Sequence, residues 1–296
     1  MLPTSSAAGP RRRPPAPARA RPGLALVAGL GAGCAGKGDS GAGCPEALSV
    51  EALGAVQDTA LDEISGLAAS EVHPGTFWAV EDKVGPARLV ALGADGAVQG
   101  VLRLDGVDLK DAEDLALVDG LLIVADTGDN EGVRASATLW RVPEPAALAA
   151  EMEAAAEPWT FTLPGGPRDI EALLAPDRDG AAYLIAKAGD GGPVFEVPAG
   201  GGAAAEVGAV DLGGAAGQVS GGGVDPLTGD VWLRTGGALL LYPGAAGSGL
   251  LGALGAPPCP LEAPDEPNPE AVAPVDGGVV LVSEGAGASL WEVRAG

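Results

Sequence analysis

One pattern of polar and apolar residues occurs five times along this chain of 296 residues. Each copy begins with a polar start, continues as a short apolar run, turns at a glycine and returns as a second apolar run. The third residue of each start serves as an anchor for comparing the copies. The anchors are Ser65, Glu113, Glu171, Ser220 and Glu270. A period of roughly 40–50 residues that holds about four short strands is typical of one β-propeller blade.

The sequence therefore predicts an all-β protein, a β-propeller of about five blades with four antiparallel strands each. Six blades are the alternative count, and a β-sandwich is the alternative architecture, although a sandwich would not require the same polar start in every copy. The longest interval between anchors contains an Ala- and Glu-rich insert at residues 146–158, for which we expect a short helix. The last copy lacks an outer strand, and residues 47–56 are expected to supply it and so close the ring.

The N-terminus has the features of an export signal. Five arginines and no acidic residue precede a short apolar segment at residues 23–33, which is too short to span a membrane. The segment ends at Cys34 and resembles a bacterial lipoprotein signal, with an ordinary cleaved signal as the alternative. We expect residues 1–33 to be a lipoprotein signal peptide, Cys34 to carry a lipid, residues 34–45 to form a flexible tether, and residues 46–296 to form the propeller. The implied location is the cell envelope, at the bacterial outer or plasma membrane.

The cysteine count agrees with export. If Cys34 is acylated, Cys44 and Cys259 remain as an even pair in an oxidising compartment, and we expect them to form a disulfide. That bond would hold the N-terminal strand close to the fourth and fifth blades.

The charge excludes some partners. The whole chain has a net charge of −23, and removal of the five arginines with residues 1–33 leaves 12 basic and 40 acidic residues, a net charge near −28. Nucleic acids and anionic membrane surfaces would be repelled, whereas cations would be attracted. His73 is the one histidine of the sequence, and it lies in a predicted turn, so no Ser-His-Asp triad can be built.

The polar starts predict where a site would lie. Residues two apart in a strand face the same way, so the first and third residues of each start are expected to share a face at one mouth of the central channel. The ends of the second strands add Asp82, Asp126, Lys187, Thr235 and Glu284 at places that we take to correspond. The candidate ligand-binding residues are Glu63, Asp82, Asp111, Glu113, Asp126, Asp129, Asn130, Asp169, Glu171, Lys187, Glu270 and Glu284.

Crowded carboxylates must be protonated, paired with basic groups or neutralised by a cation. Hard oxygen ligands favour calcium, with Glu113, Asp126, Glu171 and Glu270 as the candidate metal ligands. Asp126 to Gly132 resembles part of a calcium loop. The alternative, that these acids cap strand ends and accept backbone hydrogen bonds, stays open.

Several phrases occur in a familiar order, among them Ile64-Ser65-Gly66-Leu67, Ala112-Glu113-Asp114-Leu115, Thr127-Gly128-Asp129-Asn130 and Asp169-Ile170-Glu171-Ala172. From about residue 60 to 294 the chain resembles a family of secreted bacterial β-propeller proteins with no established activity. Its first blade is also similar to phytase-like esterase propellers and to SdiA-regulated propellers. The resemblance implies a propeller but says little about function, for which two classes remain.

The first class is an exported, envelope-anchored binding or scaffold protein with an acidic, calcium-binding channel mouth. Its partners would be the membrane, through the lipid on Cys34, and a small molecule, a cation or an envelope protein, with the chain as a monomer. The second class is a metal-dependent phytase-like phosphoesterase or esterase. The scarcity of basic residues near the acids favours binding over hydrolysis of phosphate esters.

Overall fold

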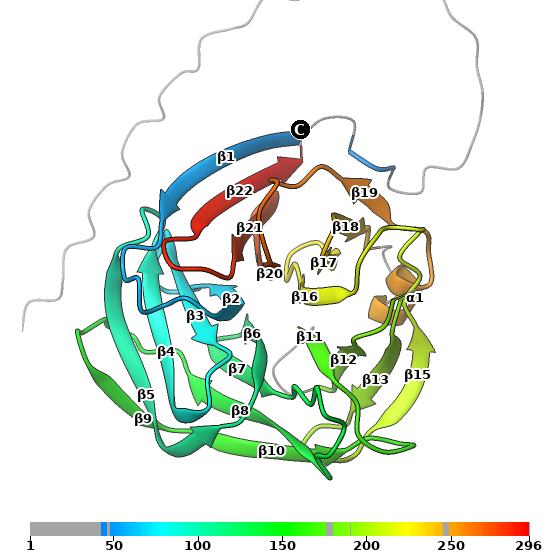
Figure 1. Cartoon of the computed structure of the whole chain (residues 1–296), viewed down its shortest axis with the longest axis horizontal. Helices are drawn as coiled ribbons and strands as arrows, with labels where there is room; N and C mark the ends of the chain where they lie inside the picture. The colour runs from blue at the N-terminus through cyan, green and yellow to red at the C-terminus, as the bar shows by residue number, and fades with distance from the viewer. Residues whose placement is uncertain (1–42, 46–47, 176–179, 190, 245–248, 296) are drawn as a thin grey trace, which may run out of the picture. The chain divides into compact units, whose positions relative to one another are not determined.

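The computed structural model describes residues 43–45, 48–175, 180–189, 191–244 and 249–295. The expected signal peptide, Cys34 and the tether up to residue 42 lie outside the described residues. Where the chain is described, its strands form five separate sheets arranged as the blades of a ring, so the prediction of five blades is confirmed (Figure 1). None of the helices in these described ranges is long and apolar enough to cross a membrane.

The first two blades are larger than expected. Blade 1 contains β2 (Ile64–Ala69), β3 (Thr76–Glu81), β4 (Gly85–Gly93), β5 (Val98–Leu109) and β9 (Met152–Ala155). Blade 2 contains β6 (Ala112–Val118), β7 (Leu121–Asp126), β8 (Ala137–Pro143), β10 (Glu157–Thr162) and β14 (Gly202–Ala203). The fifth strand of each runs parallel to its neighbour, whereas the other four are antiparallel.

The other three blades have the expected four antiparallel strands. Blade 3 contains β11 (Ile170–Leu174), β12 (Ala182–Ala186), β13 (Pro193–Val197) and β15 (Ala205–Ala209). Blade 4 contains β16 (Val219–Val224), β17 (Val231–Thr235), β18 (Ala238–Tyr242) and β19 (Cys259–Leu261), with helix α1 (Gly249–Leu254) before β19. Blade 5 contains β20 (Pro269–Val275), β21 (Gly278–Ser283), β22 (Ser289–Ala295) and β1 (Leu48–Ala55).

The expectation of a helix in residues 146–158 is wrong. The segment instead forms β9 and the start of β10. Alanine and glutamate favour helix by intrinsic propensity, but here they alternate with a period of two. Met152 and Ala154 pack against the core of blade 1 while Glu153 and Ala155 are exposed. Burial of one face of a strand therefore outweighs a modest local propensity.

The ends of the chain close the ring as expected. β1 pairs with β22 from Leu48 opposite Ala295 to Ala55 opposite Ser289, so the first strand completes the last blade (Figure 1). Cys44 and Cys259 form a disulfide. Because Cys44 precedes β1 of blade 5 and Cys259 begins β19 of blade 4, the bond joins the outer parts of these two blades.

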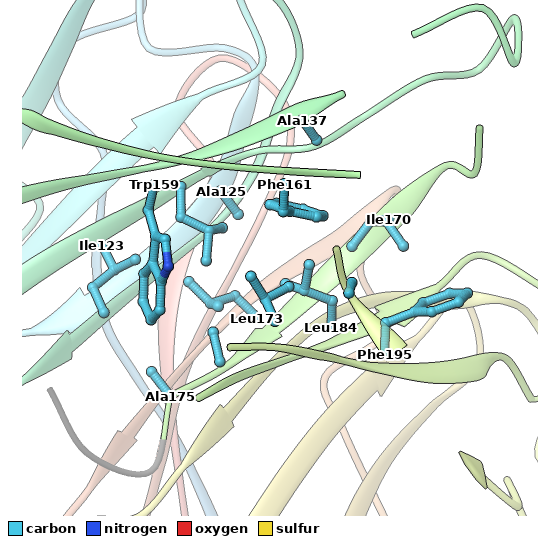
Figure 2. Close-up of a cluster of buried hydrophobic side chains, with 14 of the residues drawn as sticks. Ile123, Ala125, Ala137, Trp159, Phe161, Ile170, Leu173, Ala175, Leu184 and Phe195 are labelled. Atoms are coloured by element: carbon cyan, nitrogen blue, oxygen red, sulfur yellow. The ribbon is translucent and has the colours of Figure 1, made fainter. Parts of the chain in front are cut away.

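The hydrophobic core lies between adjacent blades. Ile123, Trp159 and Phe161 of blade 2 face Leu173 and Phe195 of blade 3 across one such interface (Figure 2). Each blade is thus buried on both faces, and the five inner strands, β2, β6, β11, β16 and β20, are left around the central channel (Figure 1).

Candidate cation site at the acidic mouth of the channel

Every inner strand has a β-bulge at its anchor residue. The pairing of each inner strand with the second strand shifts between Ile64 and Gly66, Ala112 and Asp114, Ile170 and Ala172, Val219 and Gly221, and Pro269 and Ala271. The residue left out of the pairing in each blade is the anchor. A bulge leaves one residue without a partner across the ladder and turns its side chain to a new direction. The fivefold repeat in the sequence is therefore a fivefold repeat of bulges.

The two serine anchors join neighbouring blades. Ser65 Oγ donates a hydrogen bond of 2.6 Å to the carbonyl oxygen of Ala112, and Ser220 Oγ donates one of 2.7 Å to that of Pro269. The following residues, Gly66 and Gly221, lie so close to the next inner strand that a Cβ atom would be 2.5 Å from its backbone. A serine followed by a glycine thus fixes blade 1 to blade 2 and blade 4 to blade 5.

The glutamate anchors form the floor of the acidic mouth, which we define as the channel end where the inner strands begin. Among the described residues, no side-chain hydrogen bond links Glu113, Glu171 or Glu270 to the backbone of the next blade; Glu171 accepts one from Lys187 of its own blade instead. The three glutamates belong to the acidic mouth together with Asp82, Asp111, Asp169 and Glu284. Blade 4 contributes no acidic residue to this set.

Two groups of three carboxylates share Glu113. In the first, oxygen atoms of Asp82, Asp111 and Glu113 all lie within 4.8 Å of one another. In the second, oxygen atoms of Glu113, Asp169 and Glu171 meet the same limit. The structure therefore brings together five of the predicted residues, from three blades.

Burial and mutual repulsion hold protons on these acids. Burial, and then the charges of Glu171 and Asp111, raise the pKa of Glu113 to about 10. Burial and a hydrogen bond with Asp111 raise the pKa of Asp82 to about 7. Burial also raises the pKa of Glu171 to about 7, against the opposing effect of Lys187. The cluster is thus far from fully ionised at neutral pH.

Glu270 and Glu284 form a more open extension of the cluster in blade 5. Burial, followed by the charge of Glu284, raises the pKa of Glu270 to about 8. Burial and the charge of Glu63 raise the pKa of Glu284. Glu63 itself is exposed, and its carboxylate lies 3.8 Å from Lys83 Nζ. Glu63 therefore lies at the rim of the mouth.

Glu113 belongs to both carboxylate groups, and its side chain is only 8% exposed. The like charges of both groups therefore act on this one carboxyl group. A cation bound beside Glu113 would offset the repulsion in both groups.

Lys187 is held within the second group. Its Nζ atom lies 2.7 Å from Glu171 Oε1 and 3.6 Å from Asp169 Oδ2. Its backbone amide donates a hydrogen bond to the carbonyl oxygen of Asp169. The predicted arrangement of many acids around one lysine is therefore present.

Asp126 does not belong to the acidic mouth, and its alignment with Asp82 is wrong by one residue. The register pairs Asp126 with Ala112, as it pairs Glu81 with Ile64. The residue equivalent to Asp82 is Thr127, because both amides donate to the carbonyl of the first residue of a start. The Asp126 carboxylate accepts hydrogen bonds from the amides of Lys110 and Asp111 and pairs with Arg134 at 3.0 Å. The alignment of Thr235 with Asp82 is also wrong by one residue, because Gly236 is the residue equivalent to Asp82.

The loop that resembles part of a calcium loop is closed by its own side chains. The Asp129 carboxylate accepts hydrogen bonds from the amides of Val133 and Arg134, and the Arg134 guanidinium donates to the carbonyls of Gly128 and Asp126. Asn130 is exposed. These contacts are those of a hydrogen-bonded turn in which Asp129 accepts backbone amides and Arg134 pairs with Asp126.

Asp114 is a buried acid of the channel that sequence reasoning did not assign. It accepts hydrogen bonds from the amides of Leu115, Leu173 and Gly222, which belong to blades 2, 3 and 4. Burial raises its pKa well above the usual range. Strict alternation would point Asp114 away from the channel, but the bulge at Glu113 allows both residues to face it. The sequence feature that could have identified Asp114 is the presence of two adjacent acids, Glu113 and Asp114, inside an otherwise apolar strand.

Beyond Asp114, the other end of the channel is a separate cavity of about 180 Å³. It is lined by residues of all five blades, including Leu67, Leu117, Ala175, Leu227 and Pro274. The channel thus has an acidic mouth at one end and, at the other, a cavity whose lining mixes apolar residues with the acids Glu71, Asp225 and Asp276.

Comparisons with known proteins give structural similarity alone. No protein-family model matches the chain, and no curated protein matches it. Among solved structures, the PQQ-bound aldose sugar dehydrogenase of Streptomyces coelicolor is similar with 16% identity and a TM-score of 0.47, over 85% of this chain and 99% of that one. The aldose sugar dehydrogenase of Escherichia coli in its apo form gives 11% identity and a TM-score of 0.48, over 84% and 100%. Myxococcus xanthus glutaminyl cyclase gives 15% identity and a TM-score of 0.46, over 83% and 95%. The chemistry named for these proteins remains theirs, and the fold of this chain rests on its own five sheets.

Proposed function

We propose that this chain is an exported, envelope-anchored β-propeller that acts as a binding or scaffold module and holds a calcium ion at its acidic mouth. The observation that carries the proposal is the pair of carboxylate groups that share Glu113, in each of which the oxygens lie within 4.8 Å of one another. Carboxyl groups crowded in this way must either hold protons or be neutralised by a cation.

The chemistry of the ligands favours a hard cation. The groups around Glu113 consist of carboxylates, without histidine or cysteine. Calcium binds six to eight oxygen ligands at flexible geometry, whereas zinc prefers nitrogen and sulfur ligands in a tetrahedron. An open hollow of about 600 Å³ is lined by Asp82, Asp111 and Gly128, so an ion could reach the mouth from solvent.

Calorimetric titration of the purified full chain with calcium tests this function. We expect heat of binding and a rise in the thermal unfolding midpoint with the wild type, and at least a tenfold loss of affinity, about 1.4 kcal/mol, with Glu113→Gln. Glu51→Gln is the matched control, because it removes one acid from the exposed part of β1 and should leave binding unchanged. Neither heat nor thermal stabilisation in the wild type would remove the proposal.

A metal-dependent phosphoesterase or esterase is the competing function. Phosphate substrates need free cationic groups, but Arg134 and Lys187 are paired with acids of blades 2 and 3, and Arg234 is paired with Glu266. Of the four basic candidates, Arg168 alone forms no ion pair with a described acid; it is exposed and donates to the carbonyl oxygen of Pro167. His73 lies in the turn after β2, at the far end of that strand from the acidic mouth, with its Nε2 2.8 Å from the carbonyl oxygen of Pro145. These pairings support binding. Calcium-dependent turnover of phosphate or carboxyl esters that Glu171→Gln abolishes would favour the enzyme instead.

The envelope anchor rests on the sequence alone. Expression of the full chain in a bacterial host should place it in the membrane fraction, with Cys34→Ser moving it to the soluble fraction. Mass spectrometry of the N-terminus would identify the lipid. An unmodified Cys34 in a soluble product would contradict the anchor and leave the cation site untouched.

A further inference from the structure

We propose that the acidic mouth contains two cation subsites that share Glu113, and that the ammonium group of Lys187 occupies the second, so that the chain binds one calcium ion and not two. We define the first subsite by Asp82, Asp111 and Glu113, and the second by Glu113, Asp169 and Glu171. This inference rests on the proposed function, and it makes Lys187 the residue that sets the number of ions bound.

Both subsites have the dimensions of a calcium site. Calcium–oxygen distances are about 2.3–2.6 Å, so two oxygens bound to one ion are at most about 5 Å apart. In each subsite the three carboxylates offer oxygens within 4.8 Å of one another. Geometry alone therefore allows an ion in either place.

The second subsite already contains a cation. Lys187 Nζ lies 2.7 Å from Glu171 Oε1 and 3.6 Å from Asp169 Oδ2. Asp169 is further fixed because its Oδ1 atom accepts a 2.8 Å hydrogen bond from the amide of Asp129. A calcium ion would have to displace the ammonium group and break these contacts, or lie within a few ångströms of a like charge.

The first subsite has no such internal cation. No described lysine or arginine nitrogen lies within 4.0 Å of the carboxylates of Asp82, Asp111 or Glu113; the nearby Lys83 pairs with Asp62, Glu63 and Glu81 instead. Asp82 and Asp111 also line the open hollow, so the first subsite is reachable from solvent. An incoming ion would therefore bind here.

The number of calcium ions bound per chain tests the inference. Equilibrium dialysis of the full chain at saturating calcium, with metal analysis of the protein, should give one ion for the wild type and two for Lys187→Met. Methionine keeps the length of the side chain and supplies neither charge nor oxygen ligand. Lys110→Met is the matched control, since Lys110 lines the same hollow, is exposed and forms no ion pair with a described acid; it should bind one ion.

The outcomes separate the two proposals. No ion in the wild type means that the proposed function is wrong. One ion in both the wild type and Lys187→Met, or two in the wild type, leaves calcium binding intact and overturns the role of Lys187. If Lys187→Met does not fold, single acid variants decide: Asp82→Asn should abolish binding and Glu171→Gln should retain one ion, and the reverse result would overturn the inference.

Discussion

At the scale of single residues, the anchor position of the five inner strands has two different roles. Ser65 and Ser220 donate hydrogen bonds to the next blade, whereas Glu113, Glu171 and Glu270 crowd the acidic mouth of the channel. The crowded carboxyl groups retain their protons, because burial and neighbouring negative charges both disfavour ionisation. The cluster therefore makes the metal-free fold sensitive to pH.

We expect the metal-free protein to lose stability as pH rises from about 5 to about 9. The pKa of Glu113 is raised to about 10 in the folded protein, against about 4.3 in an unfolded chain, so between these values the folded state retains a proton that the unfolded state releases. The free energy of unfolding then decreases with pH. Urea unfolding at pH 5, 7 and 9 with a calcium chelator present measures this slope.

Glu113→Gln should flatten that slope, because the amide does not titrate, and should raise stability at pH 9 by about 1–3 kcal/mol. Asp82, Glu171 and Glu270, whose pKa values are raised to about 7, 7 and 8, should retain part of the slope. Glu51→Gln should behave as wild type. Equal slopes in Glu113→Gln and wild type would show that Glu113 ionises normally.

Much of the site can be predicted from the sequence, and the two misses have different physical causes. Glu113 and Glu171 are predictable because the polar starts repeat, and Lys187 because it follows the second strand of its blade. The position of Asp126 depends on the register of β7 against β6, which the sequence of the turn between them does not determine. Asp114 depends on the bulge at Glu113, which lets two adjacent residues face the channel.

At the scale of elements, the inner strands determine how the blades fit together. Their bulges place the serine anchors against the carbonyls of the next blade, and the adjacent glycines allow the close approach. Thr127 in blade 2 makes an equivalent contact, since its hydroxyl donates a 3.0 Å hydrogen bond to the carbonyl of Ile170. Three of the interfaces between blades are thus linked by one kind of contact.

Ser65→Ala and Ser220→Ala should each destabilise the protein by about 1 kcal/mol, because each removes one buried or partly buried hydrogen bond. The double variant should lose the sum, since the two contacts join different pairs of blades. Ser136→Ala, in an exposed loop, is the control and should be neutral. Chemical denaturation measures all four; an effect no larger than that of Ser136→Ala would contradict the linking role.

At the scale of the whole molecule, the ring must be closed between its first and last strands. The repeat predicted five blades and the closing strand correctly, because the polar starts recur at a nearly constant period and the last copy lacks an outer strand. β9 was missed because its fit depends on the exposed edge of β5, which is remote in sequence. What holds the closure is the pairing of β1 with β22 and the bond between Cys44 and Cys259.

The disulfide spans 215 residues, so it removes much of the conformational freedom of the unfolded chain. Replacement of Cys44 and Cys259 by serine should therefore lower the free energy of unfolding by about 2–5 kcal/mol and the melting midpoint by roughly 5–15 °C. Reduction of the disulfide in the wild type should lower the free energy of unfolding by the same amount, whereas reduction should not affect the double serine variant. Because the bond lies at the outside of blades 4 and 5, calcium binding at the acidic mouth should survive in the folded variant. Loss of stability without loss of calcium binding would mean that the disulfide contributes to ring closure alone. Unchanged stability would mean that the pairing of β1 with β22 suffices to close the ring.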